Sequence, residues 1–324
     1  MTSTQPDPHM WTGLIHTGLS ASFLRVPHVP PERDALRGHG AKAAFYGLPF
    51  DSTNTSRTGA NYGPHGIREY SRQLTPYSAN FEFDLAEATS PVDCGDTEVV
   101  PGNAARTFER AQRDIGEIIA AGAVPFTLGG DHSTTIPAAR AIRDHVEDPG
   151  LILLDSHLDT APDVGGELLN HCCPVSRAVD AGFDPAKIAL VGINGWLNPR
   201  VELEYCRERG IKVIWLEEIW ERGTAWAAET AVEIAGAGDG IYLSFDIDCL
   251  DAAYAPGCCC PTPGGLTSRE AIELVRGISR EGLIGFDVVE VAPSLDGTPT
   301  TSLMAGRMTV EALAFHAGCG GAGR

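Results

Sequence analysis

Short apolar runs alternate along this chain with longer segments in which apolar residues recur at helical spacing. Short runs without polar alternation are typical of strands that are buried on both faces of a sheet. The pattern predicts strands at 43–50, 91–93, 124–130, 151–154, 187–193, 212–219, 240–248 and 283–291. It predicts helices at 67–74, at 103–121, in a segment that ends near 145, and at 174–182, 202–209, 225–235, 268–279 and 301–315.

Strands that alternate with helices indicate right-handed crossover connections and a parallel sheet that is covered on both faces. We therefore expect an α/β fold: a single three-layer domain with a central, mostly parallel sheet of about eight strands flanked by helices. Residues 1–40 are rich in proline, histidine and small residues and lack sustained periodicity. They are predicted to form an N-terminal extension on the surface or on a neighbouring subunit, with the catalytic domain at 41–324.

Composition narrows the range of partners. The 324 residues carry a formal net charge of -19, which argues against nucleic acid because a phosphate backbone requires a surface of Lys and Arg. No apolar run approaches the roughly 18 residues of a membrane span, and the amino terminus has neither the basic start nor the apolar core of a secretory signal. We therefore expect a cytoplasmic protein without a nucleic-acid or membrane partner. Its nine cysteines are predicted to be reduced thiols and not a disulfide framework.

The polar residues that carry candidate chemistry follow the ends of predicted strands. In the stretch 151–159, Asp155, His157 and Asp159 occupy every second position after an aliphatic run. On an extended chain these three side chains would project to the same side. Further metal-capable or acidic residues follow three other predicted strands: His132, Asp246, Asp248 and Glu290. Because ligands of open parallel sheets bind beyond the carboxyl ends of the strands, we expect these side chains to converge.

Two imidazoles and four carboxylates suit a pair of fairly hard divalent ions such as Mn²⁺. Four carboxylates balance the charge of two dications and leave room for one bridging hydroxide, which the ions would activate. A single ion would use only three or four of these ligands. The alternative, an acidic rim without metal, would leave the repulsion between crowded carboxylates unrelieved. The ligand set therefore favours a binuclear metal site.

Three long motifs contain these residues, namely GGDHS at 129–133, LLDSHLDT at 153–160 and SFDIDCLDAAYAPG at 244–257. They resemble the signatures of the ureohydrolase family, the arginases and agmatinases. The resemblance extends from 41 to 315 and includes GANYGPHGIR at 59–68 and GFDVVEVAP at 285–293. On these motifs the chain is identified as an agmatinase-like member. The resemblance implies an arginase-like fold and the hydrolysis of a guanidino group to an amine and urea by way of a metal-bridging hydroxide.

The resemblance also implies a role for each candidate residue. One Mn²⁺ would be held by His132, Asp155, Asp159 and Asp246, and the other by Asp155, His157, Asp246 and Asp248, so that Asp155 and Asp246 bridge. Glu290 matches the family's acidic residue that receives the guanidinium. His171 matches the histidine that relays protons near the leaving amine. Asp248 is counted with these two as a catalytic residue. Two Mn²⁺ are the implied cofactors, with Ni²⁺, Co²⁺ or Zn²⁺ as alternatives. The implied partners are a small cationic guanidino substrate and further copies of the chain, in a trimer or hexamer.

Two loops depart from the agmatinase-like pattern. Those members usually have His-Gly-Thr and Pro-Gly-Thr-Gly-Thr-Pro, where this chain has His171-Cys172-Cys173 and Pro256-Gly257-Cys258-Cys259-Cys260-Pro261. The thiols have three open interpretations: small hydrophobic side chains that line the pocket, ligands of a softer metal, or a redox-sensitive pair.

The sequence constrains the substrate less than the metal site. The segment DTAPDVGGELLN at 159–170 lacks the Ser-Gly-Asn spacing with which arginases bind an amino acid, and Asn61 stands where many agmatinase-like members carry Arg. Agmatine is therefore expected before free arginine, with guanidinobutyrate, guanidinopropionate, guanidine or a larger guanidino compound as alternatives. The second hypothesis, from another class, is a metal-binding regulatory subunit without turnover.

Overall fold

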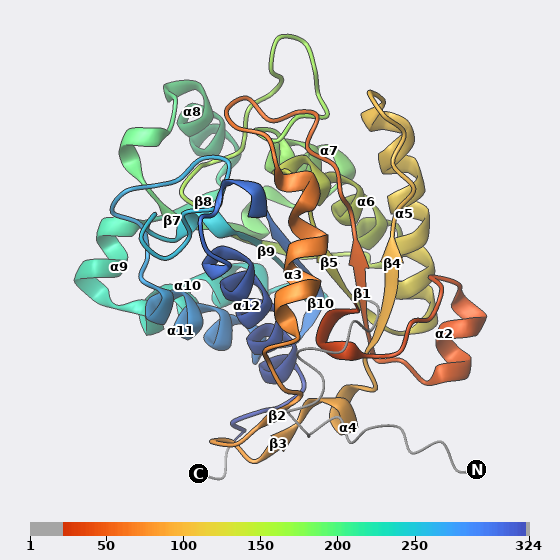
Figure 1. Cartoon of the computed structure of the whole chain (residues 1–324). Coiled ribbons are helices and arrows are strands. Elements are labelled where there is room, and N and C mark those ends of the chain that lie inside the picture. Colours follow the sequence, from red (N-terminus) through yellow and green to blue (C-terminus); the bar gives the residue numbers. More distant parts are fainter. Residues whose placement is uncertain (1–21, 322–324) are drawn as a thin grey trace, which may run out of the picture.

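Eight strands form one sheet in which every neighbouring pair runs parallel (Figure 1). The computed structural model describes residues 22–321. The strands are β1 (Ala43–Gly47), β4 (Val92–Asp96), β5 (Val124–Leu128), β6 (Gly150–Leu154), β7 (Ile188–Ile193), β8 (Lys212–Trp215), β9 (Ile241–Asp246) and β10 (Leu283–Val289). Their order across the sheet is β4-β1-β5-β10-β9-β6-β7-β8. The predicted parallel α/β sheet of about eight strands is confirmed.

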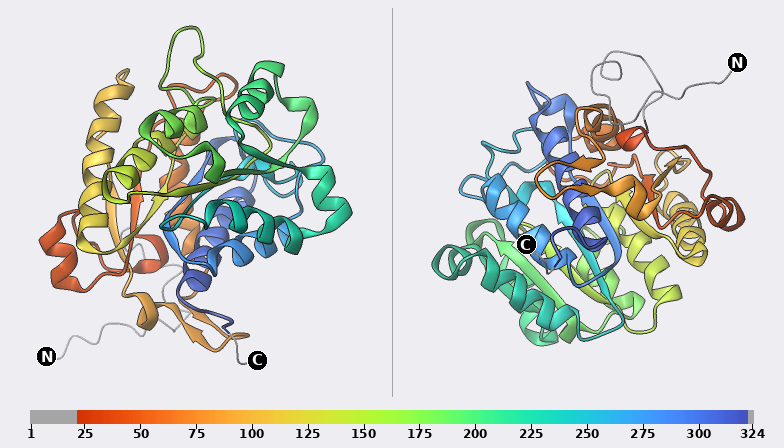
Figure 2. Two further views of the ribbon diagram at one scale, coloured as in Figure 1. Left: turned by 180° about the vertical axis from the view of Figure 1, so that it is seen from behind. Right: turned by 90° about the horizontal axis from the view of Figure 1, so that it is seen from below.

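Each face of the sheet has its own hydrophobic core, because side chains alternate along the strands. On β6, Ile152 and Leu154 belong to one core and Leu151 and Leu153 to the other. The first core is covered by α3 (Gly63–Ser71), α9 (Leu216–Arg222), α10 (Thr224–Ala235), α11 (Ser268–Ser279) and α12 (Thr300–His316). The second is covered by α2 (Arg33–His39), α5 (Ala104–Ala121), α6 (Thr135–His145), α7 (Pro174–Ala181) and α8 (Arg200–Arg209). Figure 2 shows these helices on both sides of the sheet, which makes three layers.

The helices predicted from periodicity are present with shifts of a few residues. The helix predicted at 67–74 begins earlier, at Gly63, with Pro64 in its first turn. A proline fits there because the first turn of a helix leaves its backbone N–H groups without intrahelical partners. No helix among residues 22–321 combines the length and the apolar character that crossing a membrane requires.

The strand predicted at 212–219 was wrong in its second half. β8 ends at Trp215, and Leu216 begins α9. The Glu218 side chain accepts a hydrogen bond of 3.0 Å from the backbone N–H of Trp215, which satisfies a donor at the helix start. Four further elements were not predicted: α2, the antiparallel strands β2 (Tyr77–Ser78) and β3 (Phe83–Asp84), and α4 (Leu85–Thr89).

Part of the predicted N-terminal extension packs into the core. Residues 1–21 lie outside the described residues. Phe23 is fully buried, and its ring centroid lies 4.3 Å from that of Phe45 on β1. Its backbone N–H donates a hydrogen bond of 2.8 Å to Asp93. The segment around Phe23 therefore does not lie on the surface, and the boundary at residue 40 stays a prediction.

Candidate metal centre

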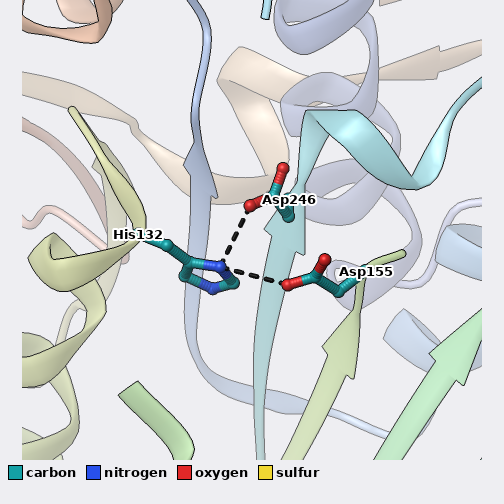
Figure 3. Close-up of side chains that lie close together, drawn as sticks. All are labelled: His132, Asp155 and Asp246. Atoms are coloured by element: carbon teal, nitrogen blue, oxygen red, sulfur yellow. Dashed lines mark ion pairs between the residues drawn. The ribbon is translucent and has the colours of Figure 1, made fainter. Parts of the chain in front are cut away.

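Four neighbouring strands, β5, β10, β9 and β6, end in the residues that the sequence singled out. His132 lies shortly after β5, Glu290 directly after β10, Asp246 at the end of β9 and Asp155 directly after β6. Because the strands run parallel, their carboxyl ends lie at one edge of the sheet. Figure 3 shows His132, Asp155 and Asp246 pointing toward one another from three of these strands.

One imidazole nitrogen of His132 faces three carboxylates. Its Nδ1 lies 3.1 Å from Asp155 Oδ2, 2.9 Å from Asp159 Oδ2 and 3.0 Å from Asp246 Oδ2. A single imidazole nitrogen carries at most one hydrogen, so it cannot satisfy three oxygens by donation. Nitrogen and oxygen atoms arranged in this way can surround a metal ion, and His132, Asp155 and Asp246 form one of the two candidate metal-binding groups among residues 22–321.

The second candidate group shares Asp155 with the first and adds His157 and Asp248. His157 Nδ1 lies 3.3 Å from Asp155 Oδ1 and 3.2 Å from Asp248 Oδ2. Asp155 therefore presents one oxygen to each group. Asp246 belongs to the first group only, and its Oδ1 accepts the backbone N–H of Asp248 at 2.8 Å. That Asp246 bridges the two groups as a second shared ligand stays a prediction.

Several ligand atoms are buried without any hydrogen-bond partner. They are His132 Nδ1, Asp155 Oδ2 and Asp248 Oδ1. A buried polar atom without a partner costs free energy, and two of these atoms, His132 Nδ1 and Asp155 Oδ2, lie 3.1 Å apart. Two divalent cations would satisfy all three at once, and the oxygen-rich donor set suits hard ions. The residues therefore fit the metals that the resemblance implies.

Burial and the repulsion between neighbouring carboxylates raise the pKa values of two aspartates of the site. Burial and the neighbouring carboxylates of Asp248 and Asp155 raise the pKa of Asp246 well above its usual range. Burial, aided by Asp155, raises the pKa of Asp248 to about 7 although the imidazole of His157 acts in the opposite direction. Bound cations would reverse both shifts, because a nearby positive charge favours the ionised carboxylate.

Asp155, His157 and Asp159 come together for a reason other than the predicted one. β6 ends at Leu154, and the residues after it are not extended. The chain turns instead: the His157 N–H donates to Asp155 Oδ1 at 2.6 Å, and Asp159 has a φ of 49°. The expectation that the three side chains project to one side of an extended chain was wrong. The turn nevertheless brings Asp155 and Asp159 to the same nitrogen of His132.

A buried series of hydrogen-bonded side chains contacts the other ring nitrogen of His132, and the sequence did not predict it. His132 Nε2 lies 3.1 Å from Ser244 Oγ, and Ser244 donates to Asp287 Oδ1 at 2.6 Å. Asp287 also accepts hydrogen bonds from Thr135 Oγ1 at 2.9 Å and from the hydroxyl of Tyr242. A partner at Nε2 leaves Nδ1 free to face the carboxylates. The spacing of Ser244 could have indicated this contact, because Ser244 lies two residues before Asp246 on β9 and both side chains therefore project to one face.

Glu290 and His171 lie beside the metal ligands. Glu290 has a φ of 64°, and its Oε1 accepts the backbone N–H of His132 at 2.7 Å. His171 Nδ1 lies 3.4 Å from the same oxygen. Burial disfavours the charged form of both groups, but their mutual attraction lowers the pKa of Glu290 and, together with the Cys172 side chain, raises that of His171. The pair is therefore a buried carboxylate beside a buried imidazole.

These groups open into one cavity of about 280 Å³. Its lining contains neither Lys nor Arg. It consists of Thr55, His157, Asp159, His171, Cys172, Leu197, Asn198, Pro199, Glu202, Asp246, Asp248, Cys260 and Glu290. The volume lies just below the range of pockets that bind drug-sized ligands, which indicates a small metabolite. An acidic lining without Lys or Arg favours a cationic one.

The cysteine loops flank this cavity as free thiols. Cys172 and Cys260 line it, whereas Cys258 and Cys259 are buried beside it. Cys259 packs with Ala60 and Ala292 in a small apolar cluster. The expectation of reduced cysteines agrees with this arrangement, and no cysteine belongs to either candidate metal group among residues 22–321.

Comparisons of this chain with a family model, with related sequences and with solved structures all indicate the same family. A family model described as the Arginase family matches residues 41–314. The chain is 35% identical to the mitochondrial agmatinase of Gallus gallus, over 90% of this chain and 84% of that protein. It is 34% identical to a guanidinobutyrase of Pseudomonas aeruginosa, over 90% and 91%. The solved structure of proclavaminate amidino hydrolase from Streptomyces clavuligerus superposes with a TM-score of 0.84 at 32% identity, covering 92% of this chain and 97% of that one. The chain therefore belongs to the arginase family of hydrolases.

Proposed function

We propose that the chain is a binuclear-metal amidinohydrolase that converts agmatine or a related ω-guanidino compound to an amine and urea. The observation that carries the proposal is the meeting of three features in one small cavity: two groups of metal-ligating atoms, the pair of Glu290 and His171, and a lining without Lys or Arg. The names of the relatives, agmatinase and guanidinobutyrase, support the guanidino group as the reacting part.

The metal ions would be divided between the two groups. His132, Asp155, Asp159 and Asp246 would hold one, and Asp155, His157, Asp246 and Asp248 the other. Imidazole and carboxylate ligands without thiolates suit Mn²⁺, with Ni²⁺, Co²⁺ or Zn²⁺ as alternatives. When bound, two such ions lower the pKa of a water that they share, so that a nucleophile is available at neutral pH.

Glu290 would bind the guanidinium. Its Oε1 accepts the His132 N–H, and its Oε2 accepts Asn54 Nδ2 at 3.1 Å. A carboxylate oxygen can accept a second hydrogen bond, so both oxygens still offer acceptors to a planar guanidinium fork. The leaving amine requires a proton when the C–N bond breaks, and His171 lies at the same carboxylate to supply it.

A further carboxylate in the cavity, that of Glu202, supports a substrate with a second positive charge. Glu202 on α8 lines the cavity and is buried. It accepts a hydrogen bond of 3.2 Å from the backbone N–H of Thr160, and burial, reinforced by Asp159, raises its pKa to about 7. An ammonium group would stabilise the ionised carboxylate of Glu202, whereas this carboxylate would repel a carboxylate tail. This difference favours agmatine over guanidinobutyrate and guanidinopropionate.

Urea release from a panel of compounds tests the proposal. The purified chain is loaded with Mn²⁺, its metal content is measured, and urea is determined with agmatine, guanidinobutyrate, guanidinopropionate, arginine and guanidine. We expect two ions per chain and the highest kcat/KM with agmatine. Two bound ions without urea from any compound would instead support the metal-binding regulatory subunit.

The proposal also covers the oligomeric state of the protein and its cellular compartment. We infer a homo-oligomer, a trimer or hexamer, in the cytoplasm, by analogy with the family and from the composition of the chain. Light scattering on the purified protein measures its mass directly, and a mass of about one chain would contradict the oligomer.

A further inference from the structure

Thr55, in the loop after β1, contacts a single ring nitrogen of His171 twice. Its backbone N–H donates a hydrogen bond to Nε2 at 3.0 Å, and its hydroxyl oxygen lies 2.8 Å from the same atom. A backbone N–H can only donate, so the nitrogen that receives it carries no hydrogen. In a neutral imidazole the hydrogen then resides on Nδ1, which faces Glu290 Oε1.

We propose that Thr55 is a positioning residue for His171. Its backbone N–H selects the Nδ1–H tautomer of the neutral imidazole and so aims the proton at the Glu290 side of the cavity, and its hydroxyl holds the ring in this position in both protonation states. The inference deepens the proposed function, because it rests on His171 as the proton carrier. Thr55 would act through His171, and no chemistry is assigned to its own hydroxyl.

The loop that carries Thr55 is anchored two residues earlier, at Thr53. The carboxylate of Asp131 accepts both the backbone N–H and the hydroxyl of Thr53, at 3.0 and 2.9 Å. Asn170, the residue before His171, donates from Nδ2 to the carbonyl oxygen of Thr53 at 3.0 Å. The two segments are therefore held together at Thr53, and the amide of Thr55 is fixed against the imidazole two residues further on.

The two donors of Thr55 respond differently when His171 gains a proton. A proton on Nε2 would confront the Thr55 N–H, because two donors cannot share a hydrogen bond. The hydroxyl can turn from donor to acceptor and so remains a partner of the imidazolium. Glu290 favours the imidazolium and the Thr55 amide favours the neutral ring, which keeps both states accessible to a residue that takes up and releases a proton.

Neutron diffraction on deuterated crystals of the Mn²⁺-loaded protein tests the tautomer without any measurement of activity. We expect deuterium on Nδ1 of His171 and none on Nε2. Deuterium on Nε2, alone or together with Nδ1, would overturn the proposal.

Matched variants test the role in turnover. Thr55→Val keeps the shape and the amide but removes the hydroxyl, and Thr55→Ser keeps the hydroxyl. We expect Thr55→Val to lower kcat about five- to tenfold with KM changed less than about threefold, and Thr55→Ser to restore most of kcat. Thr58→Val, at an exposed position in the same loop, is the control and should match the parent chain. An unchanged kcat in Thr55→Val, or an equal loss in Thr55→Ser, would contradict the role.

The two proposals fail in different ways. If no guanidino compound releases urea, the proposed function fails, while the deuterium position on His171 still decides the tautomer. If urea is released but Nε2 carries the deuterium, the role of Thr55 fails and the proposed function stands.

Discussion

Asp287 on β10 accepts a hydrogen bond of 2.6 Å from Ser244, its partner across the parallel ladder on β9. Ser244 in turn lies 3.1 Å from Nε2 of His132. A carboxylate that acts on a ligating histidine through a hydroxyl fixes the ring orientation and the tautomer. Asp287 therefore supports the candidate metal centre although it would not contact a metal ion.

We expect Asp287→Asn to weaken Mn²⁺ binding about 10- to 100-fold, the range found when such supporting groups are removed. Titration of the metal-free chain with Mn²⁺, followed by calorimetry, measures the affinity. Asp93→Asn is a matched control, since Asp93 is also buried but pairs with Arg68, at 2.8 Å. Both variants should unfold more easily, and only Asp287→Asn should lose metal affinity. Equal affinities in the two variants would remove Asp287 from the site.

Asp155 is the one carboxylate shared by both candidate metal groups. Its replacement by alanine removes a ligand from each, so we expect less than one tightly bound ion per chain and a fall in kcat of about 10³-fold or more. Metal content and urea release are measured on the same preparation. Asp163→Ala, in an exposed loop, should retain both ions and full activity. A variant at Asp155 that keeps a tenth of the rate would contradict the shared role.

The sequence predicted the end of β6 because this strand is a continuous apolar run that stops at a polar residue, whereas the predicted ends of β5, β9 and β10 lay two residues too late. The segment 151–154 has no polar position, and β6 ends where the run ends. Metal-capable residues at such ends could be assigned to one edge of the sheet from the rule for parallel strands alone. The convergence of His132, Asp155 and Asp246 follows from that rule.

Contacts between distant segments could not be predicted in the same way. The hydrogen bond between Thr55 and His171 spans 116 residues, and that between Ser244 and Asp287 spans 43. Both depend on which strands become neighbours, and β10 inserts between β5 and β9 without any local signal. The turn at Asp159 was missed for a different reason, because its positive φ is unusual for a residue with a side chain.

Glu202 should distinguish substrates by the charge of their tails. We expect Glu202→Gln to raise KM for agmatine about tenfold, because the ammonium loses its anionic partner. KM for guanidine, which has no tail, should change little, and KM for guanidinobutyrate should fall or stay constant. Steady-state kinetics of urea release with the three compounds give these values.

Glu204→Gln provides the control for this series. Glu204 lies on the same helix, α8, but is exposed, so its neutralisation should leave all three KM values unchanged. An equal rise of KM for agmatine and guanidine in Glu202→Gln would show that Glu202 supports the site in general and does not bind the tail.

The ion pairs of Glu311 on α12 should make part of the folding free energy dependent on pH. Glu311 accepts two hydrogen bonds from Arg276 on α11, at 2.7 and 2.9 Å, and one of 2.7 Å from Arg307. Burial opposes ionisation, but the two guanidinium groups outweigh it and lower the pKa of Glu311. A lowered pKa means that the unfolded chain binds the proton more readily than the folded one. The stabilisation is therefore complete above the ordinary glutamate pKa of about 4.3 and is lost as the pH falls through the lower value of the folded state.

Glu311→Gln should accordingly reduce the free energy of unfolding by about 2 kcal/mol at pH 7, below the cost of breaking a fully buried pair. The reason for the smaller value is that the side chains of Arg276 and Arg307 are 26% and 45% exposed and can return to water. The difference from the parent chain should shrink steadily as the pH is lowered below 4. Glu233→Gln, on an exposed position of α10, should show neither effect. Denaturant unfolding of the three proteins at pH 7, 5 and 3.5 measures the trend, and a difference that does not depend on pH would mean that Glu311 stabilises the fold by packing and not by charge.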